Sequence, residues 1–217
     1  MSLARGLERR LERLVDGFAA RLFGGAVHPV ELGERLVREA DLGLVPRETG
    51  PVAPNDYLVH LGGVPADSSA LGPVQRELEQ VIEITAVERG WRLDGPARVS
   101  IVVGEGGEAS VRIESGITPG PRPTWARLLP PGGRMPLEAT HNRSLVGRSG
   151  SADLHVSDAE VSRRHALIWQ ELGSTWIADL GTPNGTYVNG ERVGDPPSLA
   201  AGDVIALGPV SYVFKPV

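Results

Sequence analysis

Residues 147–190 read GRSGSADLHVSDAEVSRRHALIWQELGSTWIADLGTPNGTYVNG, and this stretch decides the fold. It holds three short motifs in a fixed order. The pair Gly147-Arg148 ends one apolar run, residues 162–165 (SRRH) open a second, and residues 181–190 (GTPNGTYVNG) place turn residues around a short strand-like segment. Short apolar segments bounded by turn residues are typical of β-strands.

The same pattern continues on both sides of this stretch. From Trp125 to the end no segment has a helical period, and turn residues recur every few positions. This spacing predicts an all-β sandwich. The expected strands are residues 125–129, 135–137, 144–147, 153–156, 165–170, 175–179, 186–188, 204–207 and 211–214.

The three motifs GR, SxxH and NGTxxNG, in this order and spacing, resemble the fork-head-associated (FHA) domain. The resemblance covers roughly residues 122–217. It implies a sandwich of about eleven strands in two sheets, with binding loops at one end. It also implies that these loops bind a phosphothreonine peptide.

The chemistry of the first two motifs fits this implication. A phosphothreonine carries about −1.5 to −2 charges at neutral pH and three acceptor oxygens, so its receptor needs fixed donors and a permanent cation. Arg148 supplies the cation, because a guanidinium stays charged and can donate two parallel hydrogen bonds to phosphate. The Ser162 hydroxyl can donate to a second oxygen, and the resemblance implies a phosphate contact for both Ser162 and Arg163.

The turn at residues 181–185 is the second predicted contact region. The resemblance implies that the Asn184 side-chain amide binds the main chain of the peptide, a task that suits an amide because it both donates and accepts. Pro183 stands where relatives often have Ser or Thr, so one hydroxyl contact is missing there. Thr182 is the candidate to replace it.

Other residues are predicted to support the binding loops. Gly147 lets the end of its strand turn without a Cβ. The resemblance gives His165 an architectural role, in which it braces the loops by hydrogen bonds. The pair Asn189-Gly190 is a type I′ hairpin signal. The complete predicted supporting set is Gly147, His165, Gly185, Asn189 and Gly190.

Helical periodicity appears only in the first half of the chain. Apolar residues at helical spacing predict an amphipathic helix over residues 7–23 and another over residues 71–89. A further helix is expected from Pro29, which suits the first helical position, to near Gly43.

Strands are expected between and after these helices. The loop at residues 104–108 (GEGGE) joins two of them and predicts a hairpin turn. Residues 46–54 carry too many breakers for regular structure. The expected strands of this half are residues 57–61, 98–103 and 109–113.

The expected fold class is thus an α+β N-terminal domain, with helices on a small mixed sheet, followed by an all-β FHA sandwich. The domains span residues 1–115 and 124–217, with a short linker at 116–123. The segments LERLVDGFAARLFGGAVHPVEL, PNDYLVHL and WRLDGPARVSIVV resemble the N-terminal domain of a family of actinobacterial FHA proteins. That domain has no established chemistry. The short linker favours a compact two-domain protein over a long tether.

Charge and composition exclude several functions. Residues 1–120 carry 13 basic and 18 acidic side chains, and residues 121–217 carry nine of each. Neither half has the basic surplus expected of a domain that binds nucleic acid. Lys215 is the only lysine, which excludes a P-loop, and the absence of cysteine excludes disulfides and thiol nucleophiles.

No catalytic residue, metal site or cofactor is predicted. The five histidines have no metal-binding spacing. Ser162 and His165 lack an orienting acid in motif position, so they do not predict a hydrolase. The chain has no signal-peptide core and no run of about 20 apolar residues, which predicts a cytoplasmic protein without membrane insertion.

The leading hypothesis is a non-catalytic phosphothreonine reader. Its partner would be a bacterial Ser/Thr protein kinase or a substrate of that kinase, and the family context links such partners to cell-wall synthesis or division. Residues 1–115 would supply a homodimer interface or bind a second partner. One alternative is a scaffold that works without phosphorylation. Another is nucleic-acid binding by the first domain, against which the net charge of −5 argues.

Overall fold

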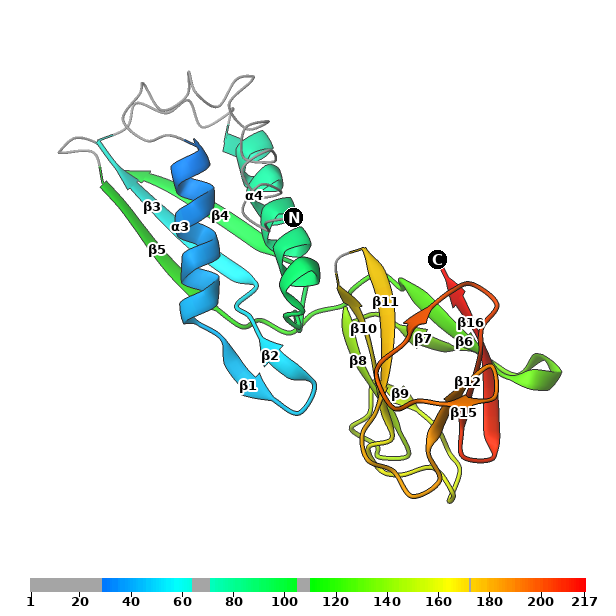
Figure 1. Ribbon diagram of the computed structural model, residues 1–217. Coiled ribbons are helices and arrows are strands. Elements are labelled where there is room, and N and C mark those ends of the chain that lie inside the picture. Colours follow the sequence, from blue (N-terminus) through cyan, green and yellow to red (C-terminus); the bar gives the residue numbers. More distant parts are fainter. Residues whose placement is uncertain (1–28, 64–70, 105–109, 172) are drawn as a thin grey trace. The chain divides into compact units, whose positions relative to one another are not determined.

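The computed structural model describes residues 29–63, 71–104, 110–171 and 173–217. The helix expected at residues 7–23 lies outside the described residues. The chain divides into two compact units (Figure 1). The first comprises Met1–Pro46, Val52–Ala86 and Leu93–Gly120; the second comprises Arg47–Pro51, Val87–Arg92 and Pro121–Val217.

The first unit contains helices and a three-stranded sheet, as the sequence predicts. Helix α3 (Pro29–Leu42) begins at the expected proline, and α4 (Leu71–Arg89) matches the helix expected at residues 71–89. Both bury an apolar stripe, formed by Leu32 and Leu36 in α3 and by Leu78 and Ile82 in α4. Neither of these two described α-helices is long and apolar enough to cross a membrane.

The sheet pairs its strands differently from the expectation. Its strands are β3 (Asp56–Gly62), β4 (Arg98–Gly104) and β5 (Ser110–Gly116), in the order β4-β3-β5. β3 pairs in parallel with β4 and antiparallel with β5, so the hairpin expected around residues 104–108 is wrong. The chain runs from β3 through α4 to β4, a crossover that produces parallel neighbours, and β5 then takes the free edge of β3.

A second correction concerns residues 46–54. The sequence predicts irregular structure there, but β1 (Val45–Arg47) and β2 (Gly50–Val52) form a two-stranded sheet. Both strands of such a ribbon are edge strands. Prolines are tolerated on edges, which explains why Pro46 and Pro51 do not prevent the pairing.

The second unit is the predicted sandwich, with eleven strands among the described residues. Nine strands agree with the expected segments to within a few residues. The other two are β13, which completes the hairpin expected at Asn189-Gly190, and β14, which is two residues long. The strands are β6 (Ala126–Leu129), β7 (Leu137–Ala139), β8 (Arg143–Gly147), β9 (Leu154–His155), β10 (Ala166–Glu171), β11 (Ser174–Asp179), β12 (Thr186–Val188), β13 (Glu191–Arg192), β14 (Ser198–Leu199), β15 (Val204–Leu207) and β16 (Val210–Pro216).

These strands form two sheets that share one core. The five-stranded sheet has the order β14-β11-β10-β8-β9, and the six-stranded sheet has the order β13-β12-β15-β16-β6-β7. Val146 and Ile168 contribute to the core from the first sheet, and Ile205 and Phe214 from the second. Burial of these apolar side chains stabilises the strands whose ends carry the candidate site.

The predicted linker at residues 116–123 is partly fixed to the first unit. The buried Asn55 accepts a hydrogen bond from the Thr118 N–H at 2.9 Å, and its amide donates to the Thr118 carbonyl at 2.9 Å. Thr118 Oγ1 donates to Asp56 at 3.1 Å. Residues 116–120 accordingly belong to the first unit, and residues 121–123 belong to the second.

Candidate functional site

Two loops of the second unit meet at Gly147. The backbone N–H groups of Arg148 and Ser149 donate to the carbonyls of Ser162 and Arg163, at 3.0 and 3.1 Å. A Cβ on residue 147 would lie 2.3 Å from the Arg163 carbonyl oxygen. Only glycine fits this close approach of two backbones, which is the physical reason for the glycine of the GR motif.

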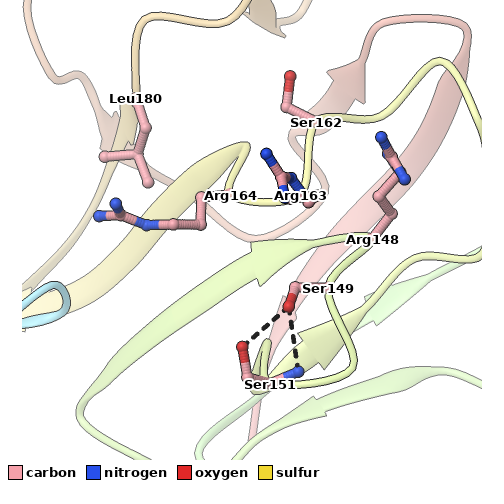
Figure 2. Close-up of a pocket in the computed structure, with 7 residues that line it drawn as sticks. All are labelled: Arg148, Ser149, Ser151, Ser162, Arg163, Arg164 and Leu180. Carbon is pink, nitrogen blue, oxygen red and sulfur yellow. Dashed lines mark hydrogen bonds between the residues drawn. The ribbon is translucent and has the colours of Figure 1, made fainter.

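The two loops line a pocket of about 670 Å³ (Figure 2). Figure 2 shows that the Arg148 and Ser162 side chains extend to the same side of the loops, whereas Arg164 extends toward Leu180. The described lining carries three guanidinium groups and no carboxylate. Its residues are Arg148, Ser149, Ser151, Ser162, Arg163, Arg164 and Leu180.

The pocket brings together three of the five predicted contact residues. Arg148 and Arg163 are exposed and Ser162 is half-buried, so their polar groups are open to a ligand. Ser149, Ser151 and Leu180 belong to none of the three sequence motifs. The Ser-Gly-Ser composition directly after Arg148 is the available signal for the two serines, since Ser and Gly are typical loop residues.

The two serines of the first loop are hydrogen-bonded to each other. Their hydroxyl oxygens lie 2.9 Å apart, and the Ser151 N–H donates to Ser149 Oγ at 3.3 Å. The Ala152 N–H donates to the Ser149 carbonyl at 3.0 Å, which closes a tight turn. The loop therefore presents hydroxyl groups beside Arg148 in a fixed arrangement.

His165 is fully buried and joins the second loop to a third. Its Nδ1 accepts from the Ser162 N–H at 3.1 Å, so the other ring nitrogen, Nε2, carries the proton and donates to the Gly185 carbonyl at 3.1 Å. The histidine thus holds the pocket loop at Ser162 against the turn at residues 181–185. This geometry is that of a brace, as the resemblance implies, and it leaves no ring nitrogen for a ligand.

Asp179, which lies outside the three sequence motifs, organises that turn. Its carboxylate accepts from the N–H groups of Gly181 and Thr182 and from the hydroxyls of Thr182 and Thr186, at 2.7 to 2.9 Å. Burial alone would raise the pKa of Asp179, but these hydrogen bonds outweigh it and hold the pKa below its usual value.

Thr182 and Asn184 lie outside the pocket lining. Thr182 is buried, and its hydroxyl donates to Asp179 and accepts from the Gly185 N–H at 3.1 Å. Asn184 is exposed, and its amide donates to the carbonyl and the carboxylate of Glu160 at 2.9 and 3.0 Å. Thr182 thus serves the turn itself, whereas Asn184 directs its amide nitrogen to Glu160.

The hairpin between β12 and β13 has the geometry of its turn type. Asn189 and Gly190 both have positive φ, 51° and 87°, as a type I′ turn requires. Asn189 also accepts from the Val204 N–H at 2.9 Å and donates to Asp203. Gly185 has a φ of 71°, and a Cβ there would lie 2.9 Å from Arg192 Nε.

Two more arginines near this edge have intramolecular partners. The guanidinium of Arg143 stacks 5.2 Å from the Trp169 ring centroid and donates to the Thr49 carbonyl at 2.7 Å. Burial lowers the pKa of Arg143, and the nearby Glu171 opposes that shift. Arg164, which does line the pocket, pairs with Glu48 at 3.0 Å.

The substitution Gly147→Ala tests whether the backbones of the two loops must lie this close together. We expect Gly147→Ala to destabilise the sandwich by about 1–3 kcal/mol, the usual range for overpacking, and to weaken binding of a phosphothreonine peptide. Gly150→Ala is the matched control in the same loop, because a Cβ at residue 150 would have nothing within 4 Å. Denaturant unfolding and peptide titration measure both effects. Equal behaviour of the two variants would contradict the role given to Gly147.

The Asp179 carboxylate gives a prediction with a pH dependence. Asp179→Asn removes an acceptor and should destabilise the sandwich by about 1.5–3 kcal/mol, the value of a hydrogen bond to a charged group. Because the folded-state pKa is lowered, this stabilisation is present above the unfolded pKa of about 3.9 and is lost as the pH falls through the folded value. The stability gap between wild type and variant should therefore be constant near neutral pH and shrink below about pH 4. A gap that does not change on acidification would refute this.

Comparison with known proteins extends the sequence resemblance. A family model described as "FhaA, N-terminal domain" matches residues 5–109, and a model described as "FHA domain" matches residues 145–208. The glycogen accumulation regulator GarA of Mycobacterium tuberculosis is 34% identical over 140 residues, which span 63% of this chain and 81% of GarA. The oxoglutarate dehydrogenase inhibitor of Corynebacterium diphtheriae is 40% identical over 71 residues, 33% of this chain and 49% of the inhibitor.

Solved structures of similar proteins include two examples of different length. Mycobacterium tuberculosis EmbR, in complex with a low-affinity phosphopeptide, is 27% identical with a TM-score of 0.40, covering 42% of this chain and 24% of EmbR. The FHA domain of FhaA, in complex with an intracellular domain of another protein, is 32% identical with a TM-score of 0.39. The match covers 42% of this chain and 99% of that FHA domain. Both TM-scores lie below 0.5, so the assignment of this chain to a family rests on the sequence matches. The chain belongs to the FHA-domain family and carries, ahead of its FHA domain, the N-terminal domain described for FhaA.

Proposed function

We propose that this chain is a non-catalytic cytoplasmic adaptor that binds a phosphothreonine peptide in the pocket between its two loops. Its partner is a bacterial Ser/Thr protein kinase or a phosphorylated substrate of one. The observation that supports this most directly is the pocket itself, in which Arg148, Arg163 and Arg164 meet hydroxyl groups in a described lining without carboxylates.

The arrangement suits a doubly charged ester. The guanidinium of Arg148 can donate two hydrogen bonds to the phosphate, and the Ser162 hydroxyl can donate a third. The guanidinium of Arg163 raises the local positive potential, whereas Arg164 is paired with Glu48. The domain as a whole is neutral, since residues 121–217 carry nine basic and nine acidic side chains. Positive charge gathered at one pocket of a neutral domain favours one phosphate over a long polyanion.

The names of the relatives support a regulatory role. One is named a regulator of glycogen accumulation and another an inhibitor of oxoglutarate dehydrogenase. Both names describe proteins that act on other proteins or processes. A scaffold that ignores phosphorylation is the competing function, and it predicts equal binding of phosphorylated and unphosphorylated partners.

Arg148→Ala tests the proposal. We expect the variant to lose about 2–5 kcal/mol of binding free energy for a phosphothreonine peptide, as for a charge pair that becomes buried on binding. The peptide is first selected by the wild-type chain from a degenerate phosphothreonine library, and calorimetry compares it with its unphosphorylated form. Arg127→Ala, which alters an ion pair with Glu138 elsewhere on the sandwich, should bind like wild type. Equal wild-type affinity for both peptide forms would instead support the scaffold.

Leu180 is the apolar side chain of the pocket lining, and we propose that it contacts the threonine methyl. Burying one methyl group contributes about 0.8 kcal/mol, which is about a fourfold preference for phosphothreonine over phosphoserine. Leu180→Ala should reduce that preference and leave phosphoserine affinity nearly unchanged. Titration with matched phosphothreonine and phosphoserine peptides measures the ratio, and an undiminished preference would place the methyl contact elsewhere.

A further inference from the structure

A buried ion pair lies at the base of the loop that carries Arg148. Arg92 donates from its two terminal nitrogens to the two carboxylate oxygens of Asp153, at 2.9 Å each. The side chains are only 10% and 16% exposed. Arg92 is 61 residues away in sequence, in the segment Val87–Arg92 that belongs to the sandwich unit. Two parallel hydrogen bonds of this kind fix the carboxylate in position and in orientation.

Asp153 connects the two ends of the phosphate-facing loop. It directly precedes β9, and its Oδ2 accepts from the Leu145 N–H in β8 at 2.8 Å. β8 and β9 pair in parallel, with Val146 opposite Leu154, and residues 148–153 form the connection between them. The carboxylate therefore closes the base of the loop that holds Arg148, Ser149 and Ser151.

Arg92 holds both sides of that base. Besides the carboxylate, its Nη1 donates to the Arg143 carbonyl in β8 at 2.6 Å. Two further hydrogen bonds hold the backbone at Arg92. The Arg92 N–H donates to the Pro51 carbonyl at 2.8 Å, and the Asn142 amide donates to the carbonyl of the preceding residue, Trp91. His141 Nδ1 lies 3.3 Å from Oδ1 of Asp153, so nitrogen atoms surround the carboxylate.

We propose that Arg92 is a positioning residue of the phosphopeptide site and acts through Asp153. It does not line the pocket, so it does not touch the ligand. Removing its charge would leave a largely buried carboxylate without its cation, which is strongly unfavourable. The carboxylate would then turn toward water and release the Leu145 N–H, and the loop that orients Arg148 would lose its closure. This inference rests on the proposed function of the pocket.

The experiment uses the full chain and the phosphothreonine peptide selected by the wild type. We expect Arg92→Met to weaken peptide binding at least tenfold, and Arg92→Lys, which keeps the charge but not the fork, to weaken it less. Adding Asp153→Asn to Arg92→Met should restore most of the affinity, because it removes the stranded charge and keeps an oxygen for the Leu145 N–H. The double variant therefore tests whether the stranded charge, and not the loss of the arginine itself, weakens binding.

Two controls separate loop positioning from general stability. Ile205→Val destabilises the buried core of the same sandwich, and Arg127→Met breaks a different ion pair; both should keep wild-type affinity. If Arg92→Met does not fold, Arg92→Lys and the double variant decide the question. Wild-type affinity in Arg92→Met overturns the inference. If Arg92→Met does not fold, wild-type affinity in Arg92→Lys together with a folded double variant that binds at least tenfold more weakly than wild type overturns it. A wild type that does not distinguish the phosphopeptide from its unphosphorylated form refutes the proposed function instead.

Discussion

The contact on which the site depends is the approach of two backbones at Gly147. β8 and β10 pair within one sheet, with Val146 opposite Ala166, and this pairing brings the end of one strand and the start of the other to the same edge. At that edge, backbone hydrogen bonds join the loop after β8 to the loop before β10. The two backbones lie so close that a Cβ on residue 147 would not fit. Every guanidinium and hydroxyl of the described pocket lining is carried by one of these two loops. Their relative position therefore fixes the geometry that a phosphate would meet.

Buried polar groups extend this order to the neighbouring turn. His165 joins the Ser162 amide to the Gly185 carbonyl, and Asp179 gathers the donors of residues 181–186. A buried hydrogen-bond network is favourable only when its members are satisfied, which makes such a network specific for one loop arrangement. The buried His165 thus links the loop that carries Ser162 to the turn that Asp179 organises.

Much of the fold and part of the site follow from the sequence. Helix α3 begins at Pro29 because proline suits a first helical position, and the sandwich is evident from short apolar segments between turns. The hairpin predicted at residues 104–108 is wrong because turn composition does not reveal that β3 lies between β4 and β5. Arg148, Ser162 and Arg163 match motifs. Asp179 lies outside every motif, and Arg92 pairs with Asp153, which is 61 residues away in the sequence. Such roles depend on three-dimensional proximity, which a linear pattern does not contain.

The ion pair between Arg92 and Asp153 bears on how this protein could have evolved. The match to the FHA family begins at residue 145. Arg92, whose charge neutralises Asp153, lies 61 residues before Asp153 and thus outside the match. A fragment that starts anywhere within residues 93–144 would contain the Asp153 carboxylate without its counter-ion. Transfer of the sandwich to another protein therefore keeps this ion pair only if the upstream arginine is transferred with it.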